Sequence, residues 1–222
     1  MPSPLLKKLR EAIDYAGTDG ATKVVILQSG GDRTFCAGAS FDELISIKDE
    51  QQGEAFFMGF ANVINAMRSC SKIIIGRVQG KAVGGGVGLA AATDYCLATK
   101  YAAVKLSELS IGIGPFVISP VVERRIGTTA FAHLALDATH WQTAAWAKEK
   151  GLFADVYEDT ATLDAAVQEL AVQLAKSNPK ALSKMKKILW NGTEHWDKLL
   201  HQRAQISGQL VLSDFTKKAL TK

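Results

Sequence analysis

Two stretches in the N-terminal half have the hydrophobic period of an amphipathic helix. In residues 4–16 and again in residues 54–70, large apolar side chains recur every three or four positions, which places them on one face of a helix. Both stretches are therefore predicted to be helices with one buried face. The apolar positions are Leu5, Leu6, Leu9, Ile13 and Tyr15 in the first stretch and Phe56, Phe57, Phe60, Ile64 and Met67 in the second.

Short apolar runs between these stretches and after them predict β-strands. The run 22–29 is rich in β-branched residues, and the run 72–78 is continuously apolar, as in a parallel sheet that is covered on both faces. Residues 95–100 and 102–107 predict two more strands, and residues 152–157 predict a further short one. Strands that alternate with helices indicate an α/β architecture.

The C-terminal part of the chain has a mainly helical pattern. From about Ile118 onward the apolar positions predict helices, and the last third predicts long amphipathic ones. We therefore divide the chain into an α/β core over residues 1–140 and a helical region over residues 141–222. Such helices can cover their own domain or pack against another subunit, and the sequence leaves both arrangements open.

The composition is that of an ordinary globular protein. The 222 residues, 47% of them hydrophobic, suffice for one domain with a sizeable core. No apolar run has the length of about 20 residues that a membrane span needs, and the N-terminus lacks the layout of a signal peptide. A cytoplasmic protein without a membrane partner is therefore expected.

Charge, cysteines and histidines argue against several kinds of site. The net charge of +4 is modest, and the lysines of residues 180–190 fit the solvated face of a helix, so no nucleic-acid partner is expected. Cys36, Cys70 and Cys96 have no CxxC spacing and are interpreted as buried apolar residues. The histidines form no ligand motif, and no metal site is expected.

Three consecutive glycines, Gly84–Gly86, lie between an apolar run and an alanine-rich segment. Glycine is costly inside a helix, so this position requires bare backbone. A dinucleotide fingerprint is excluded because Leu89 takes the place of its last glycine, and a phosphate-binding P-loop is excluded because Ala82 follows the lysine. A serine nucleophile elbow at residues 38–42 is disfavoured because Asp42 replaces its second glycine.

What remains at the glycines is a strand, a tight turn and the start of a helix. The first amides of a helix have no partner within it, and together with the helix dipole they suit an anion or a developing oxyanion. A second glycine turn, residues 35–40, also follows a strand and precedes a short helix that begins near Phe41. The two turns can each direct one amide at a single oxygen, or both can be merely close-packed.

Three segments of the chain, in their order and spacing, resemble the crotonase family of enoyl-CoA hydratases and isomerases. They are "FCAGASFDEL" (35–44), "VQGKAVGGGVGLAAATDYCLAT" (78–99) and "LSELSIGIGP" (106–115). The likeness continues through residues 141–157 to the final helix near residues 214–222, so it covers nearly the whole chain. It implies an α/β fold with a spiral of ββα units, followed by a C-terminal helical oligomerisation region, and a homotrimer or a hexamer that is a dimer of trimers.

The resemblance also implies the chemistry of the site. In this family two backbone amides polarise the carbonyl of a CoA thioester, and by motif these fall on Ala39 and Gly85. At Gly85 a side chain would obstruct the thioester oxygen. The family's acid–base glutamate matches Glu108, whose apolar surroundings are expected to raise its pKa. The substrate is an acyl-CoA, so coenzyme A arrives with the substrate and no separate cofactor is expected. Further substrate-binding positions are Ala37, Gly38, Phe41, Gly84, Gly86, Gly88 and Pro115.

One departure from the family pattern affects the choice of reaction. Hydratases of the family usually carry a second glutamate three residues after the oxyanion glycine, where this chain has Gly88. Hydration needs a base for water and an acid for the α-carbon, whereas moving a double bond needs a single base, so the missing glutamate favours isomerisation. The segment 112–127, however, resembles the methylglutaconyl-CoA hydratase branch. We predict an enoyl-CoA hydratase, with the isomerase as the alternative.

A second departure lies at the N-terminus. Family members place a strand hairpin and an Asn-Ala-Leu-like segment ahead of the helix that matches residues 3–16, and this chain starts almost at that helix. That segment supplies part of the CoA pocket and a sheet edge. A non-catalytic, acyl-CoA-binding protein on a crotonase-like scaffold is therefore a third hypothesis.

Overall fold

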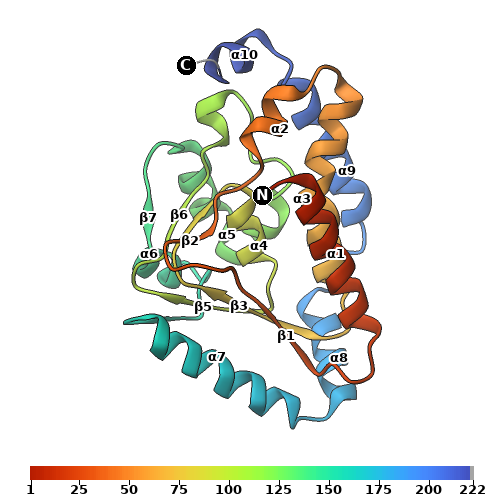
Figure 1. The fold of residues 1–222 in the computed structure, drawn as a ribbon, viewed down its shortest axis with the longest axis vertical. Coiled ribbons are helices and arrows are strands. Elements are labelled where there is room, and N and C mark those ends of the chain that lie inside the picture. Colours follow the sequence, from red (N-terminus) through yellow and green to blue (C-terminus); the bar gives the residue numbers. More distant parts are fainter. Residues whose placement is uncertain (221–222) are drawn as a thin grey trace.

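The computed structural model describes residues 1–220, which form two small sheets surrounded by helices (Figure 1). The strands are β1 (Val24–Leu27), β2 (Thr34–Cys36), β3 (Ile73–Val78), β4 (Lys81–Val83), β5 (Tyr95–Thr99), β6 (Ala103–Lys105), β7 (Gln142–Thr143) and β8 (Asp155–Tyr157). The helices are α1 (Ser3–Thr18), α2 (Phe41–Ser46), α3 (Glu50–Ser69), α4 (Gly85–Ala91), η1 (Glu108–Ile111, a 3-10 helix), α5 (Ser119–Leu136), α6 (Ala144–Glu149), α7 (Thr160–Ala175), α8 (Pro179–Leu189), α9 (Trp196–Leu210) and α10 (Asp214–Leu220).

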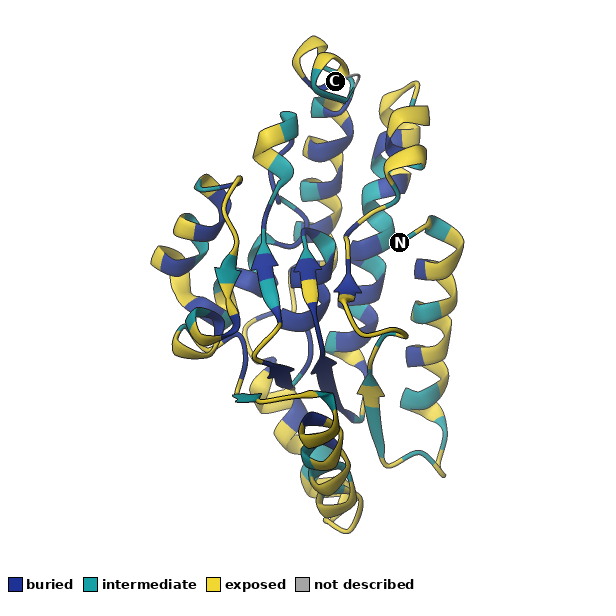
Figure 2. Cartoon of the chain, turned by 60° about the vertical axis from the view of Figure 1, so that its left-hand side comes forward, coloured by how far each residue is buried: buried dark blue, intermediate teal, exposed yellow. Residues whose placement is uncertain are grey.

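The two sheets are formed by alternate strands of the chain. One sheet has the order β1-β3-β5-β8 and is parallel throughout, and the other has the order β2-β4-β6-β7, with only β7 antiparallel. Every residue of β3 is buried, as its continuous apolar run predicts for a covered parallel sheet. Figure 2 shows the buried strands in the middle of the molecule and the exposed residues on the outer faces of the helices. The expected α/β fold is confirmed.

Several strands are shorter or more numerous than the hydrophobic pattern predicts. The run 22–29 contains only the strand β1, and the turn 30–40 contains the additional strand β2. Two further strands, β4 and β7, were not predicted. Strands of two or three residues are too short to show an alternating period, so the pattern reveals them only where, as for β6 and β8, they lie within a longer apolar run.

Helices α1, α3 and α9 form a layer on one side of the molecule (Figure 1). Helix α9 packs along α3, and the two backbones approach so closely that a Cβ atom at Gly53 would lie 2.7 Å from the Cα atom of Gly208. The C-terminal helix α9 therefore covers its own chain. Helix α7 packs against β1, β3 and β5 at the other end.

The predicted apolar stripe of α1 is partly wrong. Leu6 and Ile13 are buried, but Leu5 and Tyr15 are exposed. Helix α1 contacts α3 closely at Gly59, where a Cβ atom would lie 2.9 Å from the Leu6 side chain. The contact with α3 is therefore narrower than a stripe of five residues implies.

The interpretation of all lysines in residues 180–190 as solvated is also wrong for one of them. The side chain of Lys186 is only 2% exposed, and its Nζ atom lies 2.6 Å from Asp94 Oδ2. Asp94 also accepts hydrogen bonds from Trp190 Nε1 and from the amide of Ile74. This buried ion pair ties α8 to the end of α4 and to β3, and periodicity alone does not distinguish it from the exposed lysines beside it.

The interpretation of the three cysteines as buried residues agrees with the structure. Cys36, Cys70 and Cys96 are all buried free thiols. Within residues 1–220 no cluster of histidine, cysteine or acidic side chains could hold a metal ion. Over the same residues, no helix has both the length and the hydropathy that crossing a membrane requires.

Candidate active site

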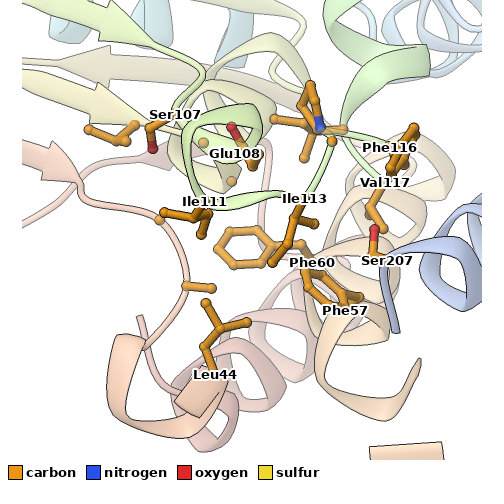
Figure 3. A pocket seen from close by; sticks show the side chains of 18 of the residues that line it. Leu44, Phe57, Phe60, Ser107, Glu108, Ile111, Ile113, Phe116, Val117 and Ser207 are labelled. Carbon is orange, nitrogen blue, oxygen red and sulfur yellow. The ribbon is translucent and has the colours of Figure 1, made fainter. Parts of the chain in front are cut away.

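A cavity of about 170 Å³ lies between the second sheet, α3 and α9 (Figure 3). It is lined by residues from the segments 37–44, 56–60, 83–85 and 107–118 and by Ser207. Most of the lining side chains are aliphatic or aromatic. The cavity therefore joins all three sequence segments that carry the family resemblance.

The glycine turn after β4 leaves one amide of the cavity wall without an acceptor. The amide of Gly84 donates to the carbonyl of Lys105 (2.9 Å), and the carbonyl of Gly84 accepts from the amides of Val87 (2.9 Å) and Gly88 (3.2 Å). Within the described residues the amide of Gly85 has no hydrogen-bond acceptor. Because Gly85 is the first residue of α4, this donor also lies at the positive end of the helix dipole.

Each of the three glycines is required by a different neighbour. Gly84 has φ = +52°, which disfavours any side chain, and a Cβ atom there would lie 2.7 Å from Glu108 Oε1. A Cβ atom at Gly85 would lie 2.4 Å from the ring of Phe60, and one at Gly86 would lie 2.3 Å from the carbonyl oxygen of Cys36. The Phe60 ring is thus the protein group that a side chain at Gly85 would meet, and the expected obstruction of the thioester oxygen stays a prediction.

The second glycine turn lies directly beside the first. A Cβ atom at Gly38, which has φ = +85°, would lie 3.1 Å from the carbonyl oxygen of Val83 and 3.8 Å from the amide nitrogen of Gly85. The amide of Ala39 has no acceptor in the part of the chain that the structure describes. Two unpartnered amides, those of Ala39 and Gly85, thus occur on adjacent turns that line one cavity.

The turn that carries Ala39 is held in place by the N-terminal residue. The amino group of Met1 donates to the carbonyl of Gly38 (2.5 Å), and the amide of Ser40 donates to the carbonyl of Met1 (3.1 Å). Ser40 in turn caps α2 by accepting a hydrogen bond from the amide of Glu43. Sequence reasoning did not identify this contribution of Met1, for which the hydrophobic pattern carries no signal.

Among the described residues that line the cavity, only Glu108 has a carboxylate. It is the first residue of η1, and its Oε2 atom is buried without a hydrogen-bond partner in the described structure. Burial raises the pKa of Glu108 from 4.5 to about 7, in the direction that its sequence context predicted. A carboxyl group with this pKa can accept and return protons near neutral pH.

The other predicted substrate-binding residues fall into two groups. Ala37, Gly38, Gly84 and Pro115 line the cavity, and so does Phe41, whose side chain is 51% exposed. Gly86 and Gly88 are not among the lining residues, and their predicted contact with substrate stays a prediction. They lie behind the wall, where Gly86 packs on Cys36 and a Cβ atom at Gly88 would lie 2.5 Å from Ile118 Cγ2.

The packing around Gly88 bears on the absent second glutamate. A glutamate at this position would have to displace Ile118, a buried residue that itself lines the cavity. The wall of the cavity is therefore built around a glycine at position 88. Glu108 has no partner carboxylate there.

Several lining residues were missed by sequence reasoning or were assigned only to the core. The helical period of α3 identifies Phe56, Phe57 and Phe60 as one buried face but does not show that part of this face borders a cavity. Phe116 and Ser207 carry no sequence signal of their own. Their place in the lining depends on the packing of the 113–118 loop and α9 against α3.

Comparison with known proteins identifies the class of protein that this fold and site define. The profile of the family described as Enoyl-CoA hydratase/isomerase matches residues 2–222. The chain belongs to this family, the crotonase family, and thus to a family of enzymes that includes hydratases and isomerases.

Individual relatives are distant but similar over most of their length. The Bacillus subtilis protein named "Probable enoyl-CoA hydratase" is 26% identical over 99% of this chain and 85% of its own. The mitochondrial methylglutaconyl-CoA hydratase of Mus musculus is 29% identical over 86% of this chain and 61% of its own. The crystal structure of an enoyl-CoA hydratase from Bacillus halodurans superposes with a TM-score of 0.92 over 99% of this chain and 89% of that one, at 22% identity, which supports the fold alone.

Proposed function

We propose that this protein is an enoyl-CoA hydratase that stabilises a thioester enolate with the amides of Ala39 and Gly85. The observation that carries the proposal is the position of Glu108. Its carboxylate, with one oxygen unpartnered and the pKa raised, lies against the Gly84 turn at an apolar cavity that two free amides also border. A base beside two converging donors is suited to forming and reprotonating an enolate.

In the proposed hydration the carboxylate of Glu108 takes a proton from water while the water oxygen bonds to C3 of the enoyl group. The electrons of the C2–C3 double bond shift toward the thioester oxygen, and the amides of Ala39 and Gly85 donate hydrogen bonds to it. Glu108 then gives its proton to C2, which restores the carboxylate and releases the 3-hydroxyacyl thioester. One carboxylate suffices only because its proton is passed on in this way.

Double-bond isomerisation is the second candidate, and the single carboxylate favours it. With no second glutamate at position 88, Glu108 can take a proton from C2 of a 3-enoyl thioester and return it to C4, through a dienolate that the same two amides stabilise. Both reactions use the same three groups. They differ only in whether water is held beside Glu108.

Two substrates separate these reactions from each other and from binding without turnover. The protein is incubated with crotonyl-CoA and, separately, with a 3-enoyl-CoA, and hydration and isomerisation are followed independently. The proposal expects hydration of crotonyl-CoA as the faster reaction. Isomerisation alone would support the second candidate, and tight binding of both thioesters without product would support a non-catalytic acyl-CoA-binding protein.

The rate of hydration is expected to rise with pH. Glu108 must begin as a carboxylate to accept a proton from water, and burial raises its pKa to about 7, so kcat/KM should increase through a single ionisation near pH 7 and then level off. The measurement is a profile of kcat/KM from about pH 5 to about pH 9. A profile that falls through pH 7 would mean that Glu108 must begin protonated, contrary to the proposal.

We further propose that the protein forms a trimer, or a hexamer of two trimers. Helix α8 leaves the apolar side chains of Met185, Ile188 and Leu189 exposed, which fits a surface that is covered in an assembly. Sedimentation at micromolar concentration should show a species of three or six chains. A species of 23.8 kDa alone would contradict this proposal.

A further inference from the structure

Ser207 places a hydroxyl group in the wall of the cavity at a distance from the reacting groups. It lies on α9 and is 1% exposed. In the view of Figure 3, Ile113 is drawn between Ser207 and Glu108. Within the described residues this hydroxyl has no hydrogen-bond partner.

The surroundings of Ser207 leave its hydroxyl open to the cavity. Among the described residues that line the cavity, only Ser107, Glu108 and Ser207 have polar side chains. The Ser207 oxygen is not among the fully buried atoms without a partner, so it keeps access to the cavity that the residue lines. A hydroxyl that faces an apolar cavity and that no protein group bonds is suited to bond a polar group placed there.

The charges around the cavity limit what this group can be. Glu108 is the only charged residue in the lining, and none of the described lining residues is lysine, arginine or histidine. A carboxylate enclosed there would lie in the same cavity as Glu108 without a counter-ion, which is strongly unfavourable. Arg203, one turn before Ser207 on α9, does not line the cavity. The polar group is therefore neutral.

We propose that Ser207 selects substrates whose acyl tail carries a neutral hydrogen-bonding group, such as a hydroxyl or a carbonyl. The proposal rests on the function proposed above, since it assumes that the thioester carbonyl lies at Ala39 and Gly85. The cavity volume of about 170 Å³ is below the roughly 300–1,000 Å³ of pockets for drug-sized ligands, so the acyl group is short. A thioester whose tail ends in a carboxylate is expected to be a poorer substrate than one of equal length with a neutral polar end.

Three 2-enoyl-CoA thioesters of equal chain length, ending in a methyl, a hydroxyl or a carboxylate group, test this inference. The unmodified protein should have a kcat/KM about tenfold higher for the hydroxyl-ended substrate than for the methyl-ended one. Ser207→Ala should remove this preference and leave the methyl-ended rate within about twofold. The exposed serine of α3 provides the matched control, because Ser69→Ala should keep the preference.

Three results would overturn the inference. One is equal use of the methyl-ended and hydroxyl-ended substrates by the unmodified protein. Another is a Ser207→Ala variant that loses activity equally on all three substrates, which would indicate a structural role for the serine. The third is a preference for the carboxylate-ended substrate, which would implicate a cation such as Arg203.

A failure of the proposed function remains distinguishable from a failure of this inference. If the unmodified protein converts none of the three thioesters, the hydratase proposal is wrong, and Ser207 is then tested by binding. Calorimetric titration with saturated acyl-CoAs that end in a hydroxyl or a methyl group should still show the tenfold preference, which Ser207→Ala should remove. Equal affinities would overturn the inference in that case.

Discussion

Glu108→Gln is expected to lower kcat for every enoyl-CoA substrate by at least about a hundredfold, the lower range for a positioned acid–base group. Glutamine has the size of glutamate but cannot take up a proton at neutral pH. No other lining residue that the structure describes has a carboxylate, so no neighbour there can replace Glu108. The affinity for CoA thioesters should change little. A variant with wild-type turnover on any enoyl-CoA would remove the catalytic assignment.

The stability of the same variant distinguishes lost chemistry from a lost fold. The pKa of Glu108 is raised to about 7 in the folded protein from 4.5, so ionisation favours the unfolded state. The wild type therefore loses stability as pH rises from the unfolded value through the folded one. Glu108→Gln has no such ionisation and avoids this loss. The difference between the free energies of unfolding of the variant and of the wild type should therefore shift by about 3 kcal/mol in favour of the variant from acid to alkaline pH. Urea unfolding at both pH values measures the change.

Gly85→Ala is expected to lower kcat by about a hundredfold, the lower end of what loss of one oxyanion donor costs. The amide itself remains, but the new Cβ atom would lie 2.4 Å from the Phe60 ring, so either the ring or the turn must move. A moved turn no longer directs its amide at the thioester oxygen. Steady-state kinetics on crotonyl-CoA measures the loss.

Two further variants test whether the effect of Gly85→Ala is steric. Gly20→Ala is the control, because a Cβ atom there meets nothing within 4 Å, and this variant should keep full activity. Gly85→Ala combined with Phe60→Leu removes the ring that the methyl group meets and should recover part of the lost rate. Full activity of Gly85→Ala alone would contradict the assignment of its amide to the oxyanion.

The longer elements of the fold could be predicted from the sequence because each contains several periods of its pattern. Helix α3 and strand β3 are examples. The three-residue strands β2 and β4 could not be found, because strands of that length have no measurable period and these two, unlike β6 and β8, lie beside glycine turns and not within a longer apolar run. The hydrophobic pattern also could not predict which single residues are buried. Lys186 differs from its exposed neighbours in its ion pair with Asp94, which is distant in sequence.

The glycine turns of the site could be predicted from the sequence, because they require residues without side chains. The residues that line the site through tertiary packing could not. Three adjacent glycines indicate a close approach, and the structure supplies a separate contact for each of them. The groups in contact, Phe60 above all, come from a helix that the sequence assigns to the core. Ser207 could not be found at all, because a lone serine on an amphipathic helix carries no signal until α9 is packed against α3.

Glu108, Ala39 and Gly85 are proposed to stabilise a thioester enolate and to exchange protons with it. Hydration and isomerisation both depend on this ability, so it is best tested without either reaction. The measurement is exchange of the C2 hydrogens of butyryl-CoA in deuterium oxide, followed by nuclear magnetic resonance. Exchange is expected with the unmodified protein, and none above background with Glu108→Gln. Binding of butyryl-CoA by the unmodified protein without any exchange at C2 would contradict this proposal.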